Sequence, residues 1–161
     1  MHVIQITGSP RFNGEIVSNI KSLELLCLFS LKSGKLRKTE IQEALYGRYS
    51  SKNSAWYPLD SLKKMGVEVC YKQGEDTYSI KEPVICDIAE VFEHLTRGEV
   101  KKAVFLLAGP ILPNTEDPFT KSLRKDLYAK IQIALKDLDE DETDIIFKNL
   151  KKRGISFAEG K

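Results

Sequence analysis

The sequence has few cysteines, no long hydrophobic run and no recognisable export signal. Its three cysteines, Cys27, Cys70 and Cys86, are odd in number and widely spaced. This spacing argues against a metal knuckle and indicates a reducing, cytoplasmic setting. The most apolar stretch, residues 23–31, contains Glu24 and is too short to cross a membrane. No basic segment precedes an apolar one at the N-terminus, so we expect no secretion signal.

Residues that carry catalytic chemistry are equally sparse. The sequence has two histidines, His2 near the N-terminus and His94 in a predicted helix. It has no Gly-rich phosphate loop, and it lacks the Gly-x-Ser-x-Gly, His-Glu-x-x-His and Cys-x-x-Cys motifs. The acidic run 137–144 is more typical of a solvated connection than of a cation site. We therefore predict that the protein is not an enzyme and uses no cofactor or metal.

The composition is that of an ordinary globular chain with an uneven distribution of charge. With 161 residues, 42% of them hydrophobic, the chain can form one large or two small domains with a real core. Residues 1–81 carry 12 Lys or Arg against 8 Asp or Glu, whereas residues 82–161 carry 13 against 15. The first half is therefore the part that would meet phosphates, although its excess is modest.

The N-terminal third is predicted to form a small sheet followed by a buried helix. Residues 3–7 are β-branched and alternate weakly, and residues 12–17 surround an Asn-Gly turn, a strong hairpin pattern. Residues 22–31 have apolar side chains on most sides, which predicts a central helix, and Ser22 is the expected cap.

Two more helices and a hairpin follow. Thr39 and Gln42 have the spacing of a capping box, which predicts a short helix that ends at Gly47. The third helix is expected within residues 54–65, where Pro58 either starts the helix or kinks it. Residues 67–80 then alternate as two strands, and we expect Gly74 to supply their turn. Three helices and a hairpin are the outline of a winged helix-turn-helix.

The second half is predicted to be helical. Pro83 marks the expected boundary, and Asp87 is the expected cap of the first helix after it. Asp117 and Pro118 have the pattern of a cap followed by proline at the first helical position. The expected helices lie within residues 87–98, 99–108, 119–138 and 145–154, and their pairing resembles a helical-repeat unit.

The order of these pieces resembles transcriptional regulators that join a response-regulator-type winged helix to a bacterial transcriptional activator domain, as in the Streptomyces antibiotic regulatory proteins. The resemblance covers nearly the whole chain. Its most specific match is Ala-Gly-Pro-Ile-Leu-Pro at residues 108–113, which is close to the family's Tyr-Arg-Gly-Pro-Leu-Leu-Pro loop. The other matching segments lie at residues 4–12, 24–28, 44–47, 53–66 and 87–92.

This resemblance implies an α+β, mostly helical fold in two domains. Residues 1–82 would be a winged helix-turn-helix DNA-binding domain with a small N-terminal β-sheet, and residues 83–161 a tetratricopeptide-like activator segment. The chain would be a transcriptional regulator of double-stranded DNA, with the third helix in the major groove. Its helical half would bind a second copy or the transcription machinery. The residues expected to contact DNA are Lys52, Asn53, Ser54, Trp56, Tyr57, Asp60, Lys63, Lys64 and Lys72.

A second interpretation comes from the same segment. Pro58 and Asp60 depart from an ordinary recognition helix, and lysines stand where the family has arginines, which pair with guanine through a two-pronged fork. These departures favour a winged-helix module that binds proteins and no longer reads DNA. Trp56 and Tyr57 would stack on bases in the first interpretation, or else fill the gap between the third helix and the sheet.

Overall fold

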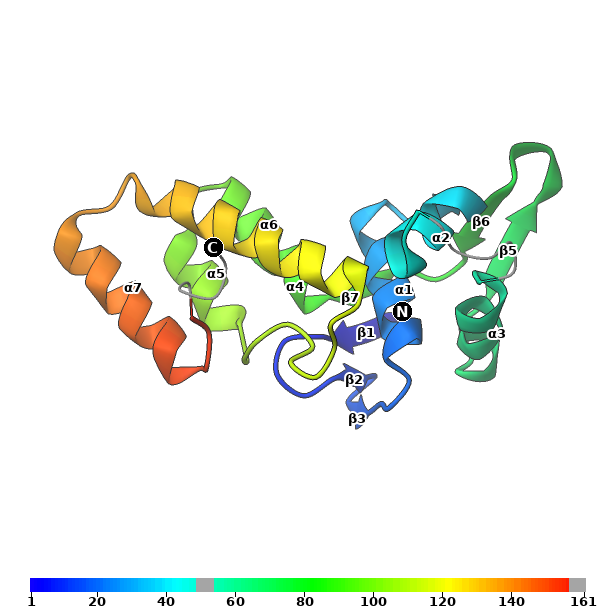
Figure 1. The fold of residues 1–161 in the computed structure, drawn as a ribbon, viewed down its shortest axis with the longest axis horizontal. Coiled ribbons are helices and arrows are strands. Elements are labelled where there is room, and N and C mark those ends of the chain that lie inside the picture. Colours follow the sequence, from blue (N-terminus) through cyan, green and yellow to red (C-terminus); the bar gives the residue numbers. More distant parts are fainter. Residues whose placement is uncertain (49–53, 157–161) are drawn as a thin grey trace.

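The computed structural model describes residues 1–48 and 54–156 as a mixed α+β, mostly helical fold. The strands are β1 (His2–Gln5), β2 (Arg11–Phe12), β3 (Glu15–Ile16), β4 (Lys35–Arg37), β5 (Val69–Lys72), β6 (Thr77–Ile80) and β7 (Val84–Cys86). The helices are α1 (Ile20–Leu31), α2 (Lys38–Tyr46), α3 (Trp56–Lys64), the short 3₁₀ helix η1 (Gln73–Glu75), α4 (Asp87–Thr96), α5 (Val100–Leu106), α6 (Pro118–Leu135) and α7 (Glu140–Lys152). The molecule is elongated, with α7 at one end and α3 with the β5–β6 hairpin at the other (Figure 1).

The first sheet has the strand order β3-β2-β1-β7. Asn13 and Gly14 both have positive φ, 48° and 87°, which is the conformation that a two-residue hairpin turn needs. The predicted Asn-Gly hairpin is thus confirmed. On its other side β1 pairs in parallel with β7, so that Ile4 lies opposite both Phe12 and Cys86. The sheet therefore joins residues on both sides of position 82.

Helix α1 is the centre of the fold, as its apolar sequence predicts. Every residue from Ser22 to Phe29 is buried, and the helix packs against α2, α3, α4 and β7. Its predicted cap was wrong, however. The helix begins at Ile20, and the Asn19 side chain accepts a hydrogen bond from the Ser22 backbone amide at 3.3 Å. Ser22 is therefore a buried residue of the first turn.

The second sheet has the order β4-β6-β5 and includes a strand that the sequence did not reveal. β4 lies between α1 and α2 and pairs antiparallel with β6, placing Leu36 opposite Tyr78. β5 and β6 form the hairpin expected within residues 67–80. Gly74 lies in the turn between them, as expected, but the residue that takes the left-handed conformation is Asp76, with φ of 47°.

Two further predicted caps are shifted. Helix α2 begins at Lys38 rather than after Thr39, because the Arg37 backbone amide donates to the Glu40 carboxylate at 3.1 Å. Helix α4 already includes Asp87, so this residue is not its cap. Its carboxylate accepts instead from the backbone amide of Ile88 in the same turn and from the β1–β2 loop.

The second half is helical, with α4 packed against α5 and α6, and α5 packed against α7. Pro118 is the first residue of α6, as predicted. The acidic run 137–144 is partly helical, because Asp139 caps α7 and accepts from the Glu142 amide at 2.8 Å. Carboxylates there face the positive end of the helix dipole. Within the described ranges, no helix combines the length and the apolar character needed to cross a membrane.

Polar contacts fasten the two halves to each other. The Asp87 carboxylate accepts from the backbone amides of Ile6 and Thr7 at 3.0 Å each and from the Thr7 hydroxyl at 2.6 Å. That hydroxyl in turn accepts from the Ala108 amide at 3.1 Å. A single cluster of buried side chains runs through both halves. The two halves thus share one core, and the division into domains 1–82 and 83–161 stays a prediction.

Candidate nucleic-acid interface

Helix α3 is the centre of the candidate interface because it presents one face to the core and another to solvent. Leu59 and Leu62 are buried against the rest of the fold, 6% and 0% exposed. Pro58 is the third helical residue, so it does not begin the helix. Amides in the first turn have no acceptor within the helix, and a proline is tolerated there.

Two aromatic side chains project from the start of α3. Trp56 is 60% exposed and Tyr57 is 65% exposed, and their rings meet edge to face with centroids 5.3 Å apart. The interpretation that they fill the gap between the third helix and the sheet is therefore wrong. Exposed aromatic rings of this kind are suited to stacking on bases or anchoring a protein partner.

The lysines of α3 lie in its last turn and differ in their pairing. Lys64 forms an ion pair with Asp60 at 3.1 Å, one turn earlier in the helix. Asp60 is thus directed along the helix surface toward a cation. Lys63 is exposed and makes no ion pair within the part of the chain that the structure describes. A phosphate that approached Lys64 would have to compete with Asp60.

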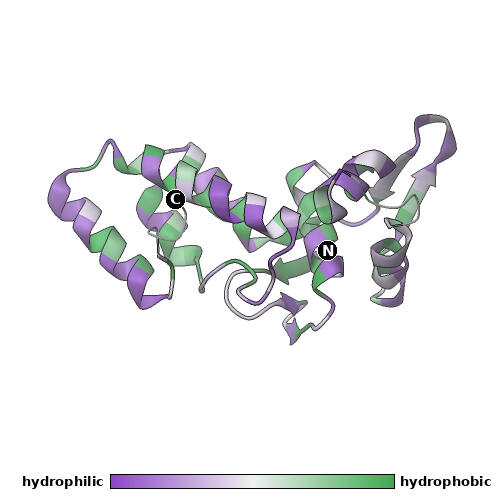
Figure 2. Ribbon diagram, in the orientation of Figure 1, coloured by the Kyte–Doolittle hydropathy of each residue, from purple (hydrophilic) through white to green (hydrophobic). Residues whose placement is uncertain are grey.

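The β5–β6 hairpin carries a similar set of internal pairs at its tip. Lys72 lies 2.9 Å from the Glu75 carboxylate, and this contact lowers the pKa of Glu75. The Tyr71 hydroxyl donates to Asp76 at 2.6 Å, and this hydrogen bond raises the pKa of Tyr71. The hairpin tip is hydrophilic, in contrast to the hydrophobic strand β1 (Figure 2).

The charges of this surface cancel in number. Residues 54–81, which contain α3 and the hairpin, have four lysines and four carboxylates. Three of the lysines are in ion pairs within the segment. These charged residues are Lys63, Lys64, Lys72 and Lys81 against Asp60, Glu68, Glu75 and Asp76.

The structure brings most of the predicted site residues to one end of the molecule. Helix α3 and the hairpin lie together there, far from α6 and α7 (Figure 1). Ser54 is half-buried just ahead of α3, whereas Lys52 and Asn53 lie outside the described residues. Sequence reasoning missed Tyr71, which is 51% exposed. Tyr71 stands two residues after the inward-facing Val69. Strand alternation therefore predicts that Tyr71 also faces inward and that its neighbours are exposed.

Neither a metal centre among the described residues nor a match to a protein family or a curated protein explains this surface. No group of three or more His, Cys, Asp or Glu residues in ranges 1–48 and 54–156 has the arrangement to hold a metal ion. The chain matches no protein-family model, and no curated protein is similar to it.

Proposed function

We propose that the chain is a DNA-binding transcriptional regulator in which residues 20–80 act as a winged helix-turn-helix. In this proposal α3 enters the major groove and the β5–β6 hairpin, as the wing, lies along the phosphate backbone. The helical half would act as a tetratricopeptide-like activator segment. The observation that carries the proposal is the position of α3, which is anchored by a buried stripe and exposes aromatic and basic residues at one end of the molecule.

The order of elements supports the proposal. Along the chain, α1 is followed by β4, then α2 and α3, then β5 and β6. The three strands form one antiparallel sheet with β6 in the centre. A short strand between the first and second helices, paired with the hairpin, ties the helices to the wing. Helix α3 contacts α1 and β5 and keeps the side chains of Trp56 and Tyr57 exposed.

The dimensions of α3 also fit. Its 9 residues span about 13 Å at 1.5 Å per residue, comparable to the major groove width of about 12 Å. Trp56 and Tyr57 would meet base edges and sugars near the helix start. Lys63 and Lys64 at the other end would meet phosphates, and Lys72 would do so from the wing.

The ion pairs of this surface set the expected strength of binding. Phosphates would have to displace Asp60 from Lys64 and Glu75 from Lys72, so affinity should be modest and strongly dependent on salt. If the three lysines each contact one phosphate, the logarithm of the binding constant should fall with the logarithm of salt concentration with a slope of about −3.

A gel-shift titration with a mixed-sequence duplex at two salt concentrations tests the proposal. Changing Lys63 and Lys64 together to Glu should abolish the shift, because two phosphate contacts are lost and two repulsions are gained. The matched control changes Lys151 and Lys152 to Glu. These are also consecutive exposed lysines in the last turn of a helix, but they lie in α7 at the far end of the molecule.

Trp56→Ala separates base contacts from phosphate contacts. It should weaken binding by roughly tenfold at either salt concentration, since an apolar contact to base edges and sugars releases no counterion. Equal loss of binding in the α3 and α7 lysine variants would contradict the proposed role of α3.

A second candidate function rests on the balance of charge. A surface with four lysines and four carboxylates, centred on an exposed aromatic pair, is also suited to a protein partner, because aromatic anchors dominate such interfaces. In that case the unit is a winged-helix protein-interaction module. Absence of duplex binding at low salt, with both lysine variants folded, would favour this candidate.

We also propose that the helical half binds a second copy or the transcription machinery. It exposes four large apolar side chains, Phe105 at 77%, Ile133 at 64%, Ile145 at 57% and Phe147 at 39%. Sedimentation of the chain over a range of concentrations tests self-association. A monomer at all concentrations would leave the transcription machinery as the proposed partner.

A further inference from the structure

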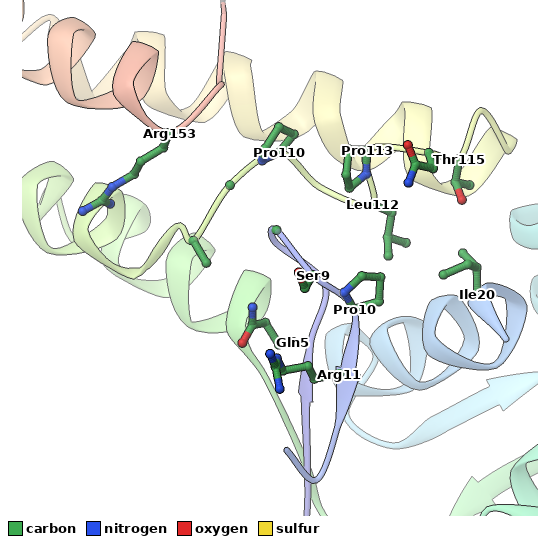
Figure 3. A pocket seen from close by; sticks show the side chains of 14 residues that line it. Gln5, Ser9, Pro10, Arg11, Ile20, Pro110, Leu112, Pro113, Thr115 and Arg153 are labelled. Carbon is green, nitrogen blue, oxygen red and sulfur yellow. The ribbon is translucent and has the colours of Figure 1, made fainter. Parts of the chain in front are cut away.

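A cavity of about 480 Å³ lies where the two halves meet, and none of its lining residues belongs to α3. Figure 3 shows the side chains that line it. One wall is the loop between β1 and β2, and the other is the loop between α5 and α6. This volume is within the range of small-molecule sites, about 300–1,000 Å³. Its lining contains two arginines and no carboxylate. Among the residues that line the cavity are Gln5, Pro10, Arg11, Ile20, Leu112 and Arg153.

The walls of the cavity are held rigidly. Leu112 is 1% exposed yet has φ of 37°, an unfavourable conformation for a residue with a branched side chain. Its amide donates to the Ile6 carbonyl at 2.9 Å, and its carbonyl accepts from Arg124 at 2.6 Å. Gly8 and Gly109 approach so closely that a Cβ on Gly109 would lie 3.0 Å from the Gly8 Cα. The cavity is therefore pre-formed.

Neither of the two arginines that line the cavity has a carboxylate partner among the described residues. Arg97 pairs with Glu93 and Arg124 pairs with Glu116, whereas Arg11 and Arg153 make no ion pair among the described residues. Arg11 donates to the Gly14 carbonyl at 2.9 Å through one of its five N–H groups. Its positive charge is therefore not neutralised by the protein.

Arg153 differs from Arg11 because its guanidinium binds backbone carbonyls of the fold. Its Nη1 donates to the carbonyls of Val104 and Leu107 at the end of α5. Figure 3 shows its side chain directed toward that helix, whereas Arg11 lies beside Gln5 at one end of the cavity. Arg153 thus adds positive potential but is committed to the fold, and Arg11 with Gln5 is the pair available to a ligand.

We propose that this cavity binds a small organic anion, with a carboxylate or phosphate head on Arg11 and Gln5 and a compact apolar body against Pro10 and Ile20. A guanidinium matches both heads through two parallel hydrogen bonds. The Gln5 amide already donates to the Thr7 carbonyl at 2.9 Å, which fixes the side chain beside the arginine. Because the walls of the cavity come from both halves, a bound anion would stabilise the contact between the halves. This site does not depend on the proposed binding of DNA.

Calorimetric titration of the full chain with four probes tests the site. Phenylphosphate and benzoate carry the two possible heads, benzyl alcohol has the same ring without charge, and inorganic phosphate has the charge without the ring. We expect saturable binding of phenylphosphate, benzoate or both, weaker binding of inorganic phosphate and none of benzyl alcohol. The stronger of the two ring anions identifies the head.

Arg11→Gln should weaken the binding of the ring anions by roughly tenfold to hundredfold, as expected for a lost charged hydrogen bond. Arg97→Gln removes an arginine outside the cavity and should change nothing. Ser9→Phe keeps both arginines and places a ring in the cavity, so it should abolish the binding of the ring anions. This variant is the deciding one if Arg11→Gln lowers the melting temperature of the free chain. The proposal is overturned by equal binding of benzyl alcohol, by unchanged binding in Ser9→Phe, or by no saturable binding of either ring anion at millimolar concentration.

Discussion

Glu24 provides the sharpest test of how the fold is held together, because it is a carboxyl in the most apolar stretch of the chain. It is 0% exposed in the middle of α1. Lys21 lies 3.9 Å from one of its oxygens and 3.1 Å from Asp117, and the Thr120 hydroxyl lies 3.4 Å from the other oxygen. The ammonium of Lys21 also lies 4.5 Å from the centre of the Tyr46 ring. The group thus joins α1, α2 and the start of α6.

Burial raises the pKa of Glu24 from 4.5 to about 8, and its hydrogen bond with Asp117 contributes to the increase. Burial alone would also raise the pKa of Asp117, but the hydrogen bond from Glu24 and the Lys21 ammonium lower it. The two carboxyls therefore share the site as a neutral acid and a carboxylate. We therefore expect Glu24 to carry a proton in the folded protein at neutral pH.

The stability of the protein should consequently fall as pH rises. Between pH 4.5 and 8 the folded chain retains the Glu24 proton and the unfolded chain has lost it, so folding requires proton uptake. The folded-state pKa is raised, which means that the contribution is fully present below 4.5 and is lost as pH rises through about 8. Each pH unit costs about 1.4 kcal/mol, so about 3 kcal/mol is lost by pH 7.

Glu24→Gln removes this proton without changing the size of the side chain. Urea unfolding at pH 5 and pH 7.5 gives the free energy of unfolding of the variant and of the wild type. The difference, variant minus wild type, should be about 3 kcal/mol larger at pH 7.5 than at pH 5. Glu43→Gln, an exposed change on α2, is the control and should show no such gain. If the difference between Glu24→Gln and wild type is the same at both pH values, Glu24 is ionised in the folded protein and the reasoning is refuted.

Two other substitutions test separate features, the first the polar contacts between the two halves and the second a turn. Asp87→Ala leaves the amides of Ile6 and Thr7 and the Thr7 hydroxyl without their acceptor, so it should lower the free energy of unfolding by about 3 kcal/mol or more, while Asp126→Ala on the exposed side of α6 should change it little. A loss in Asp87→Ala no larger than in the control would mean that these contacts are weak. Ser33→Gly should raise the urea midpoint, because Ser33 is exposed with φ of 57° and a left-handed serine costs about 1 kcal/mol; a lowered midpoint would contradict this.

The local elements of this fold follow from short-range patterns in the sequence. The Asn13-Gly14 pair produced the hairpin that it predicts, because both residues tolerate positive φ. Pro118 stands at the first position of α6, and the apolar character of residues 23–29, interrupted only by Glu24, placed α1 at the centre. Each of these features depends on residues within a turn or two of each other.

Only the tertiary structure decided the features that depend on distant partners. Strands β4 and β7 have three residues each, which is too few to show alternation. They form because β4 pairs with the edge of β6 and β7 pairs with the edge of β1. Asn19 rather than Ser22 caps α1, since the path of the chain out of the hairpin sets where the helix starts. The protonation of Glu24, the exposure of Trp56 and the uncompensated charge of Arg11 likewise depend on which elements pack nearby, and the sequence alone does not specify that packing.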